Sequence, residues 1–488
     1  MIGITSYGGY IPRMRLNRGV VYAANAWMAP GLIGSANGER SMANWDEDSL
    51  TMAVEAARDC VSGIDKQKID AAYLASVNFP FKDRLNAGIF AAALNLNESV
   101  ESADFTASLR AGLSALISGL NAVKSGDYQN VLVAAGDKRI TKMGYLHELW
   151  AGDGAAAFLL GSENVIAAYK GAFTITEDFA DHFRGHDQKF DYNWEERWIK
   201  DEGYLKIAPK AIKGLLDKTG VTGAEISKFI MPCPFGRVPA QIAGMFGISP
   251  DKVPDNMHAV CGDTATAHPL VMLIHALENA SPGDKLIVAT FAQGCTALLF
   301  EVTDQISLMK NKRGIRGALA DKQAETNYIK FLSHRGMLNE QDWMIRAEGN
   351  WRTALSTLFR HHKTIIGLVG GRCEKCGTAQ FPKSDICVNP ECLAFNTQID
   401  CEFADQKGKI MTYTSDLLTY TLDPPAHYGM VVFDNGGRNI FDFTDYEQGK
   451  IAVGLPVRMV FRIRNFDKPR GFTQYFWKAK PVISGQEV

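Results

Sequence analysis

The chain has 488 residues, 46% hydrophobic and 22% charged, which is long enough for two or three domains with large cores. The 52 Lys and Arg residues oppose 54 Asp and Glu residues, and this balance gives no basic signature for nucleic acid. The sequence contains no run of about 18 apolar residues that would span a bilayer. Its start, MIGITSYGGYIP, lacks the basic and apolar regions of a signal peptide. We therefore predict a cytoplasmic protein that binds neither nucleic acid nor membrane.

The first 303 residues alternate apolar strands with helical patterns, which is typical of an α/β fold. Two series resemble one another: VLVAAGD and then GDGAAAFLLG close the first, and LIVATFAQG and then CTALLFEV close the second. This similarity predicts an internal duplication, with halves at residues 1–165 and 166–303. The expected elements in chain order are helix 49–61, strands 71–76 and 102–106, helix 111–123, strands 131–135 and 229–231, helices 240–246 and 264–279, and strand 286–290.

The sequence changes character after residue 303. Residues 304–350 are charged and mixed, and they predict a helical connector. Residues 351–400 contain a cysteine cluster. Residues 401–488 carry short alternating strands broken by Asp-Asn-Gly-Gly and Pro turns, which are typical of a small all-β barrel.

The cysteine cluster has the spacing of a metal site. CEKCGTAQFPKSDICVNPEC places Cys373 and Cys376 two residues apart, and Cys387 and Cys392 four residues apart. Two such knuckles supply the four thiolates that tetrahedral zinc requires, with no open coordination position. We therefore predict structural Zn²⁺ that folds this segment, the alternative being a metal-free ribbon. Cys401 lies outside the spacing and is expected to be a buried strand residue.

Residues 101–116, ESADFTASLRAGLSAL, predict a strand that runs directly into a helix N-terminus. Many acyl-transfer enzymes place a cysteine at such a junction, because unpaired amides and the helix dipole lower the pKa of a thiol there. This chain instead has Ser108, Leu109 and Arg110. Any chemistry at this junction therefore uses a displaced nucleophile or no covalent intermediate.

Several motifs resemble known families. GITSYGGYIPRMRL, DFTASLRAGLSAL, AGDGAAAFLLG, PFGRVPAQIAGMFG and CGDTATAHP together resemble the 3-hydroxy-3-methylglutaryl-CoA synthase branch of the thiolase superfamily over residues 1–303. Residues from about 345 to 480 resemble an acyl-CoA-associated family that joins a rubredoxin-like zinc ribbon to an OB fold. The resemblance implies a thiolase-like duplicated βαβαβαββ fold, then a zinc ribbon at 351–400 and an OB barrel at 401–488. It also implies a coenzyme A thioester as substrate and at least a homodimer. A larger complex with another acyl-CoA enzyme is compatible with the resemblance.

The catalytic residues of the synthase family do not carry over. Matched by motif, the family's cysteine falls on Leu109, its glutamate on Val77, its histidine on Pro232 and its asparagine on Asp263. Leucine, valine and proline can neither accept an acyl group nor transfer a proton. The leading hypothesis is therefore an acyl-CoA enzyme without an acyl-cysteine, most simply an aldolase acting on a 3-hydroxyacyl-CoA.

Two alternatives remain open at this point. The first is a synthase-like or thiolase-like acyltransferase with a displaced nucleophile, either Cys233 or, after a one-residue slip of the alignment, Ser108. The second is a non-catalytic scaffold that binds acyl-CoA for another enzyme. For the OB barrel, its acidic segments favour acyl-CoA docking or channelling over nucleic acid.

An aldolase needs a base for the β-hydroxyl proton and donors for the thioester enolate. Asp263 is the first candidate base, because a desolvated carboxylate would have a raised pKa, although D-T-A-T also fits a helix cap. His258 is expected on the strand before that turn and is either catalytic or a core histidine. His147 and Tyr145 precede a Gly turn that approaches the site in relatives, with loop packing as the alternative.

Residues for substrate binding are less clearly indicated. The candidates for the pocket are Ser108, Cys233, Cys295 and Arg237, where Cys295 equally fits tight backbone packing after Gly294. The CoA phosphates need cations, for which Arg139, Lys142, Arg237 and the stretch NKRGIRG are candidates, although such residues often serve solubility alone. His268 and His275 lie about two turns apart on one expected helix without a third ligand, so we do not predict a metal there. Asp153 is expected to be a turn residue.

Overall fold

The computed structural model describes residues 1–338, 353–419 and 421–482. The chain divides into two compact units. Unit 1 comprises Met1–Ala43, Asp48–Ala91 and Leu96–Phe331, and unit 2 comprises Asn44–Glu47, Ala92–Asn95 and Leu332–Val488. Among the described helices, none has the length and apolar character needed to cross a membrane.

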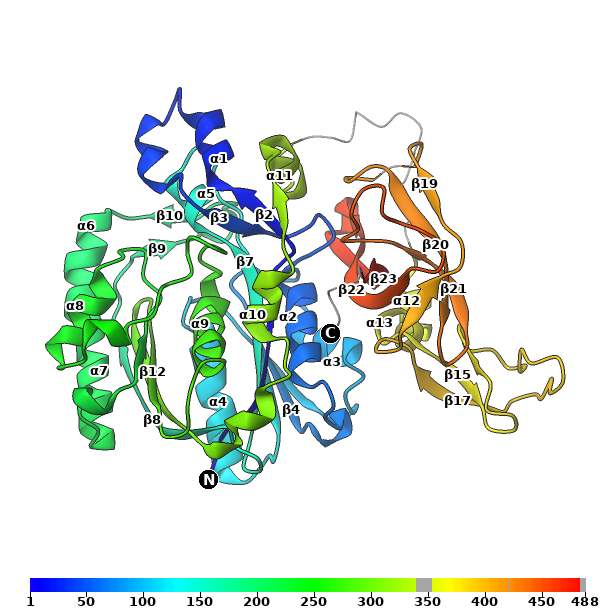
Figure 1. Cartoon of the computed structure of the whole chain (residues 1–488), viewed down its shortest axis with the longest axis horizontal. Helices are drawn as coiled ribbons and strands as arrows, with labels where there is room; N and C mark the ends of the chain where they lie inside the picture. Colours follow the sequence, from blue (N-terminus) through cyan, green and yellow to red (C-terminus); the bar gives the residue numbers. More distant parts are fainter. Residues whose placement is uncertain (339–352, 420, 483–488) are drawn as a thin grey trace. The chain divides into compact units, whose positions relative to one another are not determined.

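Unit 1 is built on a nine-stranded sheet with the order β11-β12-β13-β8-β1-β7-β6-β4-β5 (Figure 1). Its strands are β1 (Gly3–Tyr10), β4 (Ala71–Ala75), β5 (Glu101–Phe105), β6 (Val131–Lys138), β7 (Asp153–Gly161), β8 (Ala167–Thr176), β11 (Lys228–Ile230), β12 (Lys285–Phe291) and β13 (Gly294–Val302). β1 and β8 join the two halves through the pairs Gly3↔Ala168 and Ile4↔Ala167.

The predicted duplication is visible in the strand order. The first half reads β5-β4-β6-β7-β1, and the second reads β11-β12-β13-β8 without a counterpart of β5. The strands β4-β6-β7-β1 of the first half correspond to β11-β12-β13-β8 of the second. In each set the first two strands are parallel, and the two pairs that follow are antiparallel. The α/β, thiolase-like fold class expected from the sequence is thus confirmed for unit 1. β5 lies at one edge of the sheet, and the expected homodimer stays a prediction.

The helices of unit 1 follow from their caps and apolar faces. α2 (Ser49–Cys60) begins at Asp48, whose side chain accepts a hydrogen bond from the Thr51 amide in a capping box. α4 (Ala111–Ser125) ends at Gly126, which has a φ of 86° and so takes the left-handed C-cap conformation. A Cβ on Gly112 would lie 2.5 Å from the carbonyl oxygen of Thr266. Glycine there lets α4 pack closely against η6 (Ala265–Ala267), the short turn before α9 (His268–Leu277).

Unit 1 has two hydrophobic cores, one shared by both halves and one within the second half. α4 and α9 pack with strands such as β6, whose segment VLVAAGD is buried throughout, as expected for a strand covered on both faces. α7 (Leu205–Thr219) and α8 (Val238–Met245) cover the second half together with β12 and β13. The remaining elements of residues 1–338 are β2 (Met14–Asn17), α1 (Arg18–Asn25), η1 (Pro30–Ser35), β3 (Glu39–Met42), η2 (Lys66–Lys68), α3 (Asn86–Ala93), α5 (Leu146–Trp150), β9 (His182–Phe183), β10 (Tyr192–Asn193), α6 (Glu196–Trp198), the π-helical η3 (Ile199–Tyr204), η4 (Gly223–Glu225), η5 (Pro250–Lys252), η7 (Asp304–Met309), α10 (Gly314–Ala320), β14 (Gln323–Glu325) and α11 (Tyr328–His334).

The segment predicted as a helical connector holds more than helices. It contains η7, α10 and α11, but also β14, which pairs in parallel with β2. β14 therefore makes this stretch part of a three-stranded sheet of unit 1, and residues 339–352 lie outside the described residues.

Unit 2 has the all-β character expected from the sequence. A three-stranded sheet has the order β16-β15-β17, and a six-stranded sheet has the order β19-β20-β18-β22-β23 with β21 paired to β20. That the second sheet is an OB barrel stays a prediction. The elements are α12 (Leu355–Arg360), α13 (His362–Ile366), β15 (Val369–Cys373), β16 (Ala379–Gln380), β17 (Gln398–Glu402), β18 (Gly408–Ile410), β19 (Thr414–Asp416), β20 (Ala426–Phe433), β21 (Arg438–Asp442), β22 (Pro456–Asp467), η8 (Lys468–Arg470) and β23 (Phe472–Pro481).

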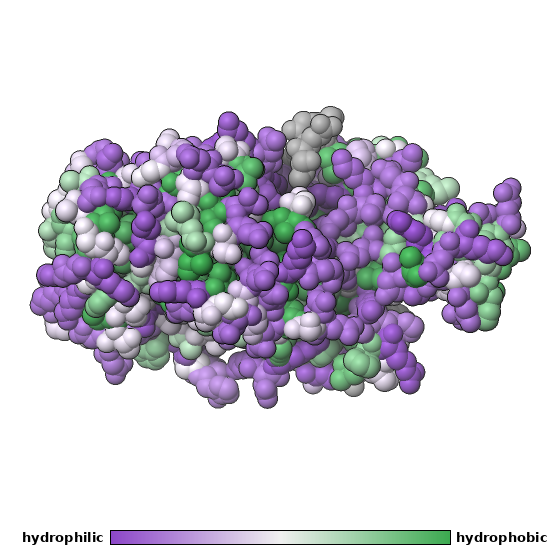
Figure 2. Space-filling model, turned by 90° about the horizontal axis from the view of Figure 1, so that it is seen from below, coloured by the Kyte–Doolittle hydropathy of each residue, from purple (hydrophilic) through white to green (hydrophobic). Residues whose placement is uncertain are grey.

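The face in Figure 2 is mostly hydrophilic, and its apolar residues form small separate groups. Isolated exposed apolar residues are normal on a protein surface and do not by themselves indicate a partner.

Candidate functional site

Two of the loops that carry mapped family positions meet in unit 1 at Asp137, a fully buried carboxylate near the end of β6. Its Oδ1 accepts hydrogen bonds from the Ser76 hydroxyl at 2.7 Å and the Val77 amide at 3.0 Å, both in the loop after β4. Its Oδ2 accepts one from the Thr266 amide at 2.9 Å, in the turn after Asp263. Asp137 therefore ties the position of the family's glutamate to the turn that carries Asp263.

The elbow between β5 and α4 contains no activated nucleophile. Ser108 donates its hydroxyl proton to Oε1 of Gln293 at 3.3 Å and accepts a hydrogen bond from the Arg110 amide at 3.3 Å. The Gln293 side chain in turn donates to Asp181. An amide oxygen is not a base, so this contact orients Ser108 without activating it.

The two buried thiols near the site are also inactive as nucleophiles. Cys233 and Cys295 are 1% and 0% exposed, and burial raises the pKa of each thiol to about 12. Nucleophilic attack requires the thiolate, which is scarce at neutral pH when the pKa is that high. The nearby Tyr204 hydroxyl opposes the effect of burial on the pKa of Cys233 only in part.

Asp263 is held by its backbone and keeps one side-chain oxygen open. Its amide donates to the Trp150 carbonyl at 2.7 Å, and its carbonyl accepts from the Gly152 amide at 2.8 Å. Its Oδ1 accepts from the Ala265 amide at 2.8 Å and so supports the start of η6, whose N-cap is Thr264 and not Asp263, the cap suggested by the sequence. Among the described residues, none donates a hydrogen bond to Oδ2.

The expected raised pKa of Asp263 is wrong. Burial alone raises the pKa of this carboxyl, but His268, His258 and Arg139 together outweigh burial and lower it below its ordinary value. Asp263 is therefore ionised at neutral pH.

His258 lies in a turn that follows η5, and not on a strand as expected. Its amide donates to Oδ1 of Asn256, so the Asn256 amide nitrogen faces His258 Nδ1, at 3.1 Å. Nδ1 is thus the acceptor and Nε2 carries the proton. Nε2 is buried and has no hydrogen-bond partner within the described parts of the chain. Burial, with His268 nearby, lowers the pKa of His258 to about 4, so the ring is neutral and presents an unused N–H.

His258, Asp263 and His268 place three ligand atoms within 4.8 Å of one another, which is close enough for a metal ion. However, His268 uses both ring nitrogens: Nε2 lies 2.8 Å from the Asn256 carbonyl oxygen, and Nδ1 accepts from the Thr264 amide at 3.2 Å. A metal would have to displace a hydrogen bond of His268. We therefore assign no metal to this group.

His147 joins this group electrostatically, whereas Tyr145 does not. Burial and Arg139 lower the pKa of His147 to about 4, against the opposing effect of Asp191 and, more weakly, Asp263. We call Asp263, His258, His268, His147 and Arg139 the Asp263 cluster. Tyr145 is 56% exposed, and the Lys142 ammonium lies 5.3 Å from its ring.

Two residues proposed for the CoA phosphates are placed differently. Arg139 forms an ion pair with Asp191 and is therefore already neutralised. Arg237 is exposed at the start of α8, away from the interactions described above.

Several residues of the site had no clear signal in the sequence. Asp137 lies near the end of the buried strand β6. A charged residue in the otherwise apolar segment VLVAAGD was the signal in the sequence that could have indicated it. Tyr204 lies in a π-helical turn, a type of distortion that is frequent at functional sites. Tyr204 is electrostatically coupled to Cys233, Asp181, Asp263 and Cys295, and burial strongly raises its pKa.

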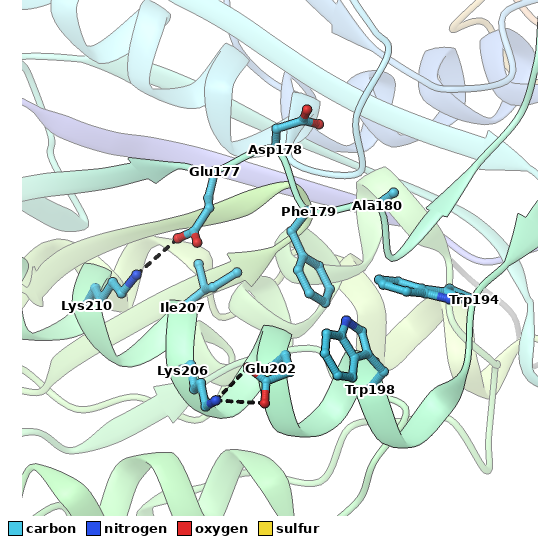
Figure 3. A pocket seen from close by; sticks show the side chains of 10 residues that line it. All are labelled: Glu177, Asp178, Phe179, Ala180, Trp194, Trp198, Glu202, Lys206, Ile207 and Lys210. Carbon is cyan, nitrogen blue, oxygen red and sulfur yellow. Dashed lines mark hydrogen bonds and ion pairs between the residues drawn. The ribbon is translucent and has the colours of Figure 1, made fainter.

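A surface pocket of about 500 Å³ is lined by residues between Glu177 and Lys210 (Figure 3). Phe179, Trp194 and Trp198 form its aromatic side, and the Phe179 ring lies 6.0 Å from Phe291, which packs on Tyr204. Its two lysines are paired with carboxylates, Lys206 with Glu202 at 2.5 Å and Lys210 with Glu177 at 3.1 Å. None of the residues predicted from the sequence lines this pocket, so we do not take it as the reaction site.

In unit 2 the four predicted zinc ligands come together. Cys373 Sγ lies 3.9 Å from Cys392 Sγ, and Cys376 Sγ lies 3.5 Å from Cys387 Sγ. Four thiolates at about 2.3 Å from zinc would be about 3.8 Å apart, so the arrangement fits a tetrahedral ZnS₄ centre. All four sulfur atoms lie within 4.8 Å of one another, and Cys401 is a buried strand residue outside the group.

Comparison with known proteins finds relatives over the first two thirds of the chain. The hydroxymethylglutaryl-CoA synthase of Caldivirga maquilingensis is 30% identical over 346 residues, which cover 69% of this chain and 98% of that protein. The chain belongs to the hydroxymethylglutaryl-CoA synthase family. The synthase of Methanocella arvoryzae is 28% identical over 348 residues, covering 69% of this chain and 99% of the relative.

Family models match two further segments. Residues 216–302 match the C-terminal domain of 3-oxoacyl-[acyl-carrier-protein] synthase III, and residues 365–398 match the ChsH2 rubredoxin-like zinc ribbon domain. The family resemblance and the zinc ribbon inferred from the sequence are thereby confirmed.

Solved structures share the fold of unit 1. The synthase III of Thermus thermophilus superimposes with a TM-score of 0.54 at 18% identity, covering 62% of this chain and 98% of that chain. The synthase III of Pseudomonas aeruginosa gives a TM-score of 0.55 at 17% identity, covering 62% and 98%. At such identity these likenesses concern the fold alone.

Proposed function

We propose that this family member makes or breaks a carbon–carbon bond of an acyl-CoA without an acyl-cysteine intermediate, most simply by aldol or retro-aldol reaction of a 3-hydroxyacyl-CoA. The family supports an acyl-CoA thioester as substrate. One observation carries the proposal: Leu109 stands where the acyl-accepting cysteine belongs, while an ionised Asp263 and an unused His258 N–H remain next to each other.

In the cleavage direction, Asp263 Oδ2 takes the proton of the β-hydroxyl group as the C–O bond becomes a carbonyl. The bond between Cα and Cβ breaks, and its electron pair passes to the thioester as an enolate. A proton then returns to Cα to give the shortened acyl-CoA. The His258 Nε2–H is suited to donate to the enolate oxygen, a contribution of about 3 kcal/mol for one well-placed donor.

The relatives' name favours a second candidate, an acyltransferase like hydroxymethylglutaryl-CoA synthase. That reaction needs a thiolate or an activated hydroxyl. Cys233 and Cys295 have pKa values of about 12, and Ser108 donates to an amide oxygen. The high thiol pKa values and the Ser108 contact are our grounds for proposing the aldolase ahead of this alternative. A non-catalytic scaffold is the third possibility.

The test is incubation of the purified full chain with a series of 3-hydroxyacyl-CoAs and detection by mass spectrometry of the aldehyde or ketone and the shortened thioester. Asp263→Asn should lower the cleavage rate by roughly 10²- to 10⁴-fold, the usual contribution of a general base. Asp251→Asn, which changes an exposed carboxylate, is the matched control.

Three outcomes would count against the proposal. Full activity of D263N would refute the assigned base. An acetyl group trapped on the protein after incubation with acetyl-CoA, and lost in a Cys233→Ser variant, would establish the acyltransferase. The absence of products from every substrate would favour the scaffold.

A further inference from the structure

Three aromatic side chains form one side of the pocket in Figure 3, where they are turned toward one another: Phe179, Trp194 and Trp198, which we call the Trp194 cluster. The Trp194 ring lies 5.9 Å from the Phe179 ring and 5.5 Å from the Trp198 ring, at interplanar angles of 48° and 53°. Rings inclined in this way are not stacked face to face. Their faces are therefore available to a ligand.

The backbone and the core of unit 1 hold the Trp194 cluster in place. The Trp194 amide donates to the Asp181 carbonyl at 3.0 Å. The Phe179 ring packs at 6.0 Å against Phe291, which is only 3% exposed. Trp194 and Trp198 are each 44% exposed, so the cluster has a buried side that fixes it and an open side that faces the pocket.

The charged residues of the pocket leave a negative balance. Lys206 is paired with Glu202 at 2.5 Å, and Lys210 is paired with Glu177 at 3.1 Å. The third carboxylate, Asp178, makes no ion pair and no side-chain hydrogen bond with a described residue. The lining thus carries one more carboxylate than ammonium group, which favours a cation over an anion as the ligand.

We propose that this pocket binds a small organic cation with a trimethylammonium head group. The face of an aromatic ring attracts a cation that lies within about 6 Å of the ring centroid, and Trp is the strongest of the aromatic residues in this respect. The rings of the Trp194 cluster are close enough for one head group to contact more than one face. A primary ammonium is strongly hydrated, whereas a trimethylammonium group presents methyl groups to the rings.

The size of the pocket favours a free small molecule over a protein segment. Its volume of about 500 Å³ falls within the range of small-molecule clefts, roughly 300–1,000 Å³. The pocket contains none of the residues assigned to the proposed reaction. The inference therefore goes beyond the proposed function and does not depend on it.

The probe is choline, titrated as its chloride into the full chain and followed by calorimetry, with sodium chloride as the reference for ionic strength. Its neutral isostere is 3,3-dimethylbutan-1-ol, in which a carbon atom replaces the ammonium nitrogen. Choline should bind roughly 10-fold more tightly than the alcohol, the size expected for a cation on partly exposed rings. Equal affinity for the two compounds would overturn the inference and make the pocket an apolar site. The absence of choline binding at millimolar concentration would also overturn it.

Substitutions locate the binding and test its charge preference. Trp198→Ala should weaken choline binding by roughly 10-fold, and Trp198→Phe should weaken it less. Trp27→Ala, at a tryptophan that is 84% exposed, is the matched control. Unchanged choline affinity in a folded W198A chain would overturn the inference.

Lys206→Gln should tighten choline binding, because it leaves the Glu202 carboxylate free to face the cation. Weaker binding in K206Q would show that the pocket prefers an anion and would overturn the inference. A peptide with trimethyllysine that binds more tightly than choline would overturn the assignment to a small molecule in favour of a protein segment.

Discussion

The two units each contain a group of buried charges, and the groups differ in whether opposite charges face one another. In unit 2, Arg462 Nη2 lies 3.0 Å from Glu47 Oε1 and 3.0 Å from Asp445 Oδ2. The Lys478 ammonium lies 2.8 Å from Asp46 Oδ2. Three cations thus meet three carboxylates, all at most 5% exposed: Arg462, Lys478, Lys480, Asp46, Glu47 and Asp445, which we call the Arg462 network.

In unit 1 the corresponding groups are incompletely paired. Asp263 Oδ2 and His258 Nε2 have no hydrogen-bond partner among the described residues. Oδ1 of Asp46 in the Arg462 network also has no hydrogen bond with a described residue, but it lies 3.7 Å from Nε of Arg462 as an ion pair, so its charge is compensated. Buried polar groups without such compensation are suited to a ligand. The difference agrees with a structural role for the Arg462 network and with the catalytic role that we propose for Asp263 and His258 in unit 1.

Zinc removal should have the largest effect on stability of the changes considered, and this effect should be confined to unit 2. Cys387→Ser should abolish zinc binding, because structural zinc contributes about 10–16 kcal/mol in small zinc domains. Metal analysis should fall from one zinc per chain to none, and hydrogen exchange should show lost protection across β15–β17. Cys401→Ser should keep its zinc. Zinc retained by the C387S chain would show that the ligand set is wrong.

Arg462→Met should destabilise unit 2 by about 3–5 kcal/mol, because it leaves three buried carboxylates with two ammonium groups. The matched control is Arg464→Met on the same strand, whose 58% exposed side chain lies 3.9 Å from Asp442 and should contribute about 0–1 kcal/mol. Hydrogen exchange of β22 and β23 under increasing denaturant measures the free energy of unfolding of unit 2 in both variants. Equal stability of the two variants would contradict a structural role for the network.

A smaller effect is expected from acid on unit 1. The pKa of His258 is lowered from 6.5 to about 4, so the unfolded chain binds this proton more readily and folding weakens as the pH falls from 6.5 towards 4. Between pH 7 and pH 5 this residue should cost unit 1 about 2 kcal/mol. His258→Gln should remove that part of the pH dependence, whereas His186→Gln, at an exposed histidine, should not. Denaturant unfolding of both variants at pH 7 and pH 5 measures this loss of stability. If the loss is as large in H258Q as in the unchanged chain, His258 is not a neutral buried imidazole in the folded state.

Much of the fold was readable from the sequence because the signals are local. The expected strand 131–135 is part of β6, and the expected helix 49–61 is α2, since each carries its own apolar pattern and caps. The expected helix 264–279 is divided into η6 and α9, and Pro269 lies in the first turn of α9, where its missing N–H is tolerated. The zinc ligands lie within twenty residues of one another, so their spacing alone was sufficient.

The state of the candidate site was not readable in the same way. Asp263 and His258 were found by motif, but the pKa of Asp263 was expected to rise and is instead lowered by His258, His268 and Arg139. Ser108 meets Gln293 across 185 positions in the chain, and that contact decides that its hydroxyl is not activated.

The sequence by itself therefore determined the class of fold and the zinc ligands, because each depends on residues close together in the chain. Only the tertiary structure decided which charges are paired and which are open: Arg139 is paired with Asp191, and Arg110 has no carboxylate partner among the described residues. Protonation and pairing depend on burial and on neighbours brought together from distant segments, and no local pattern encodes those distances.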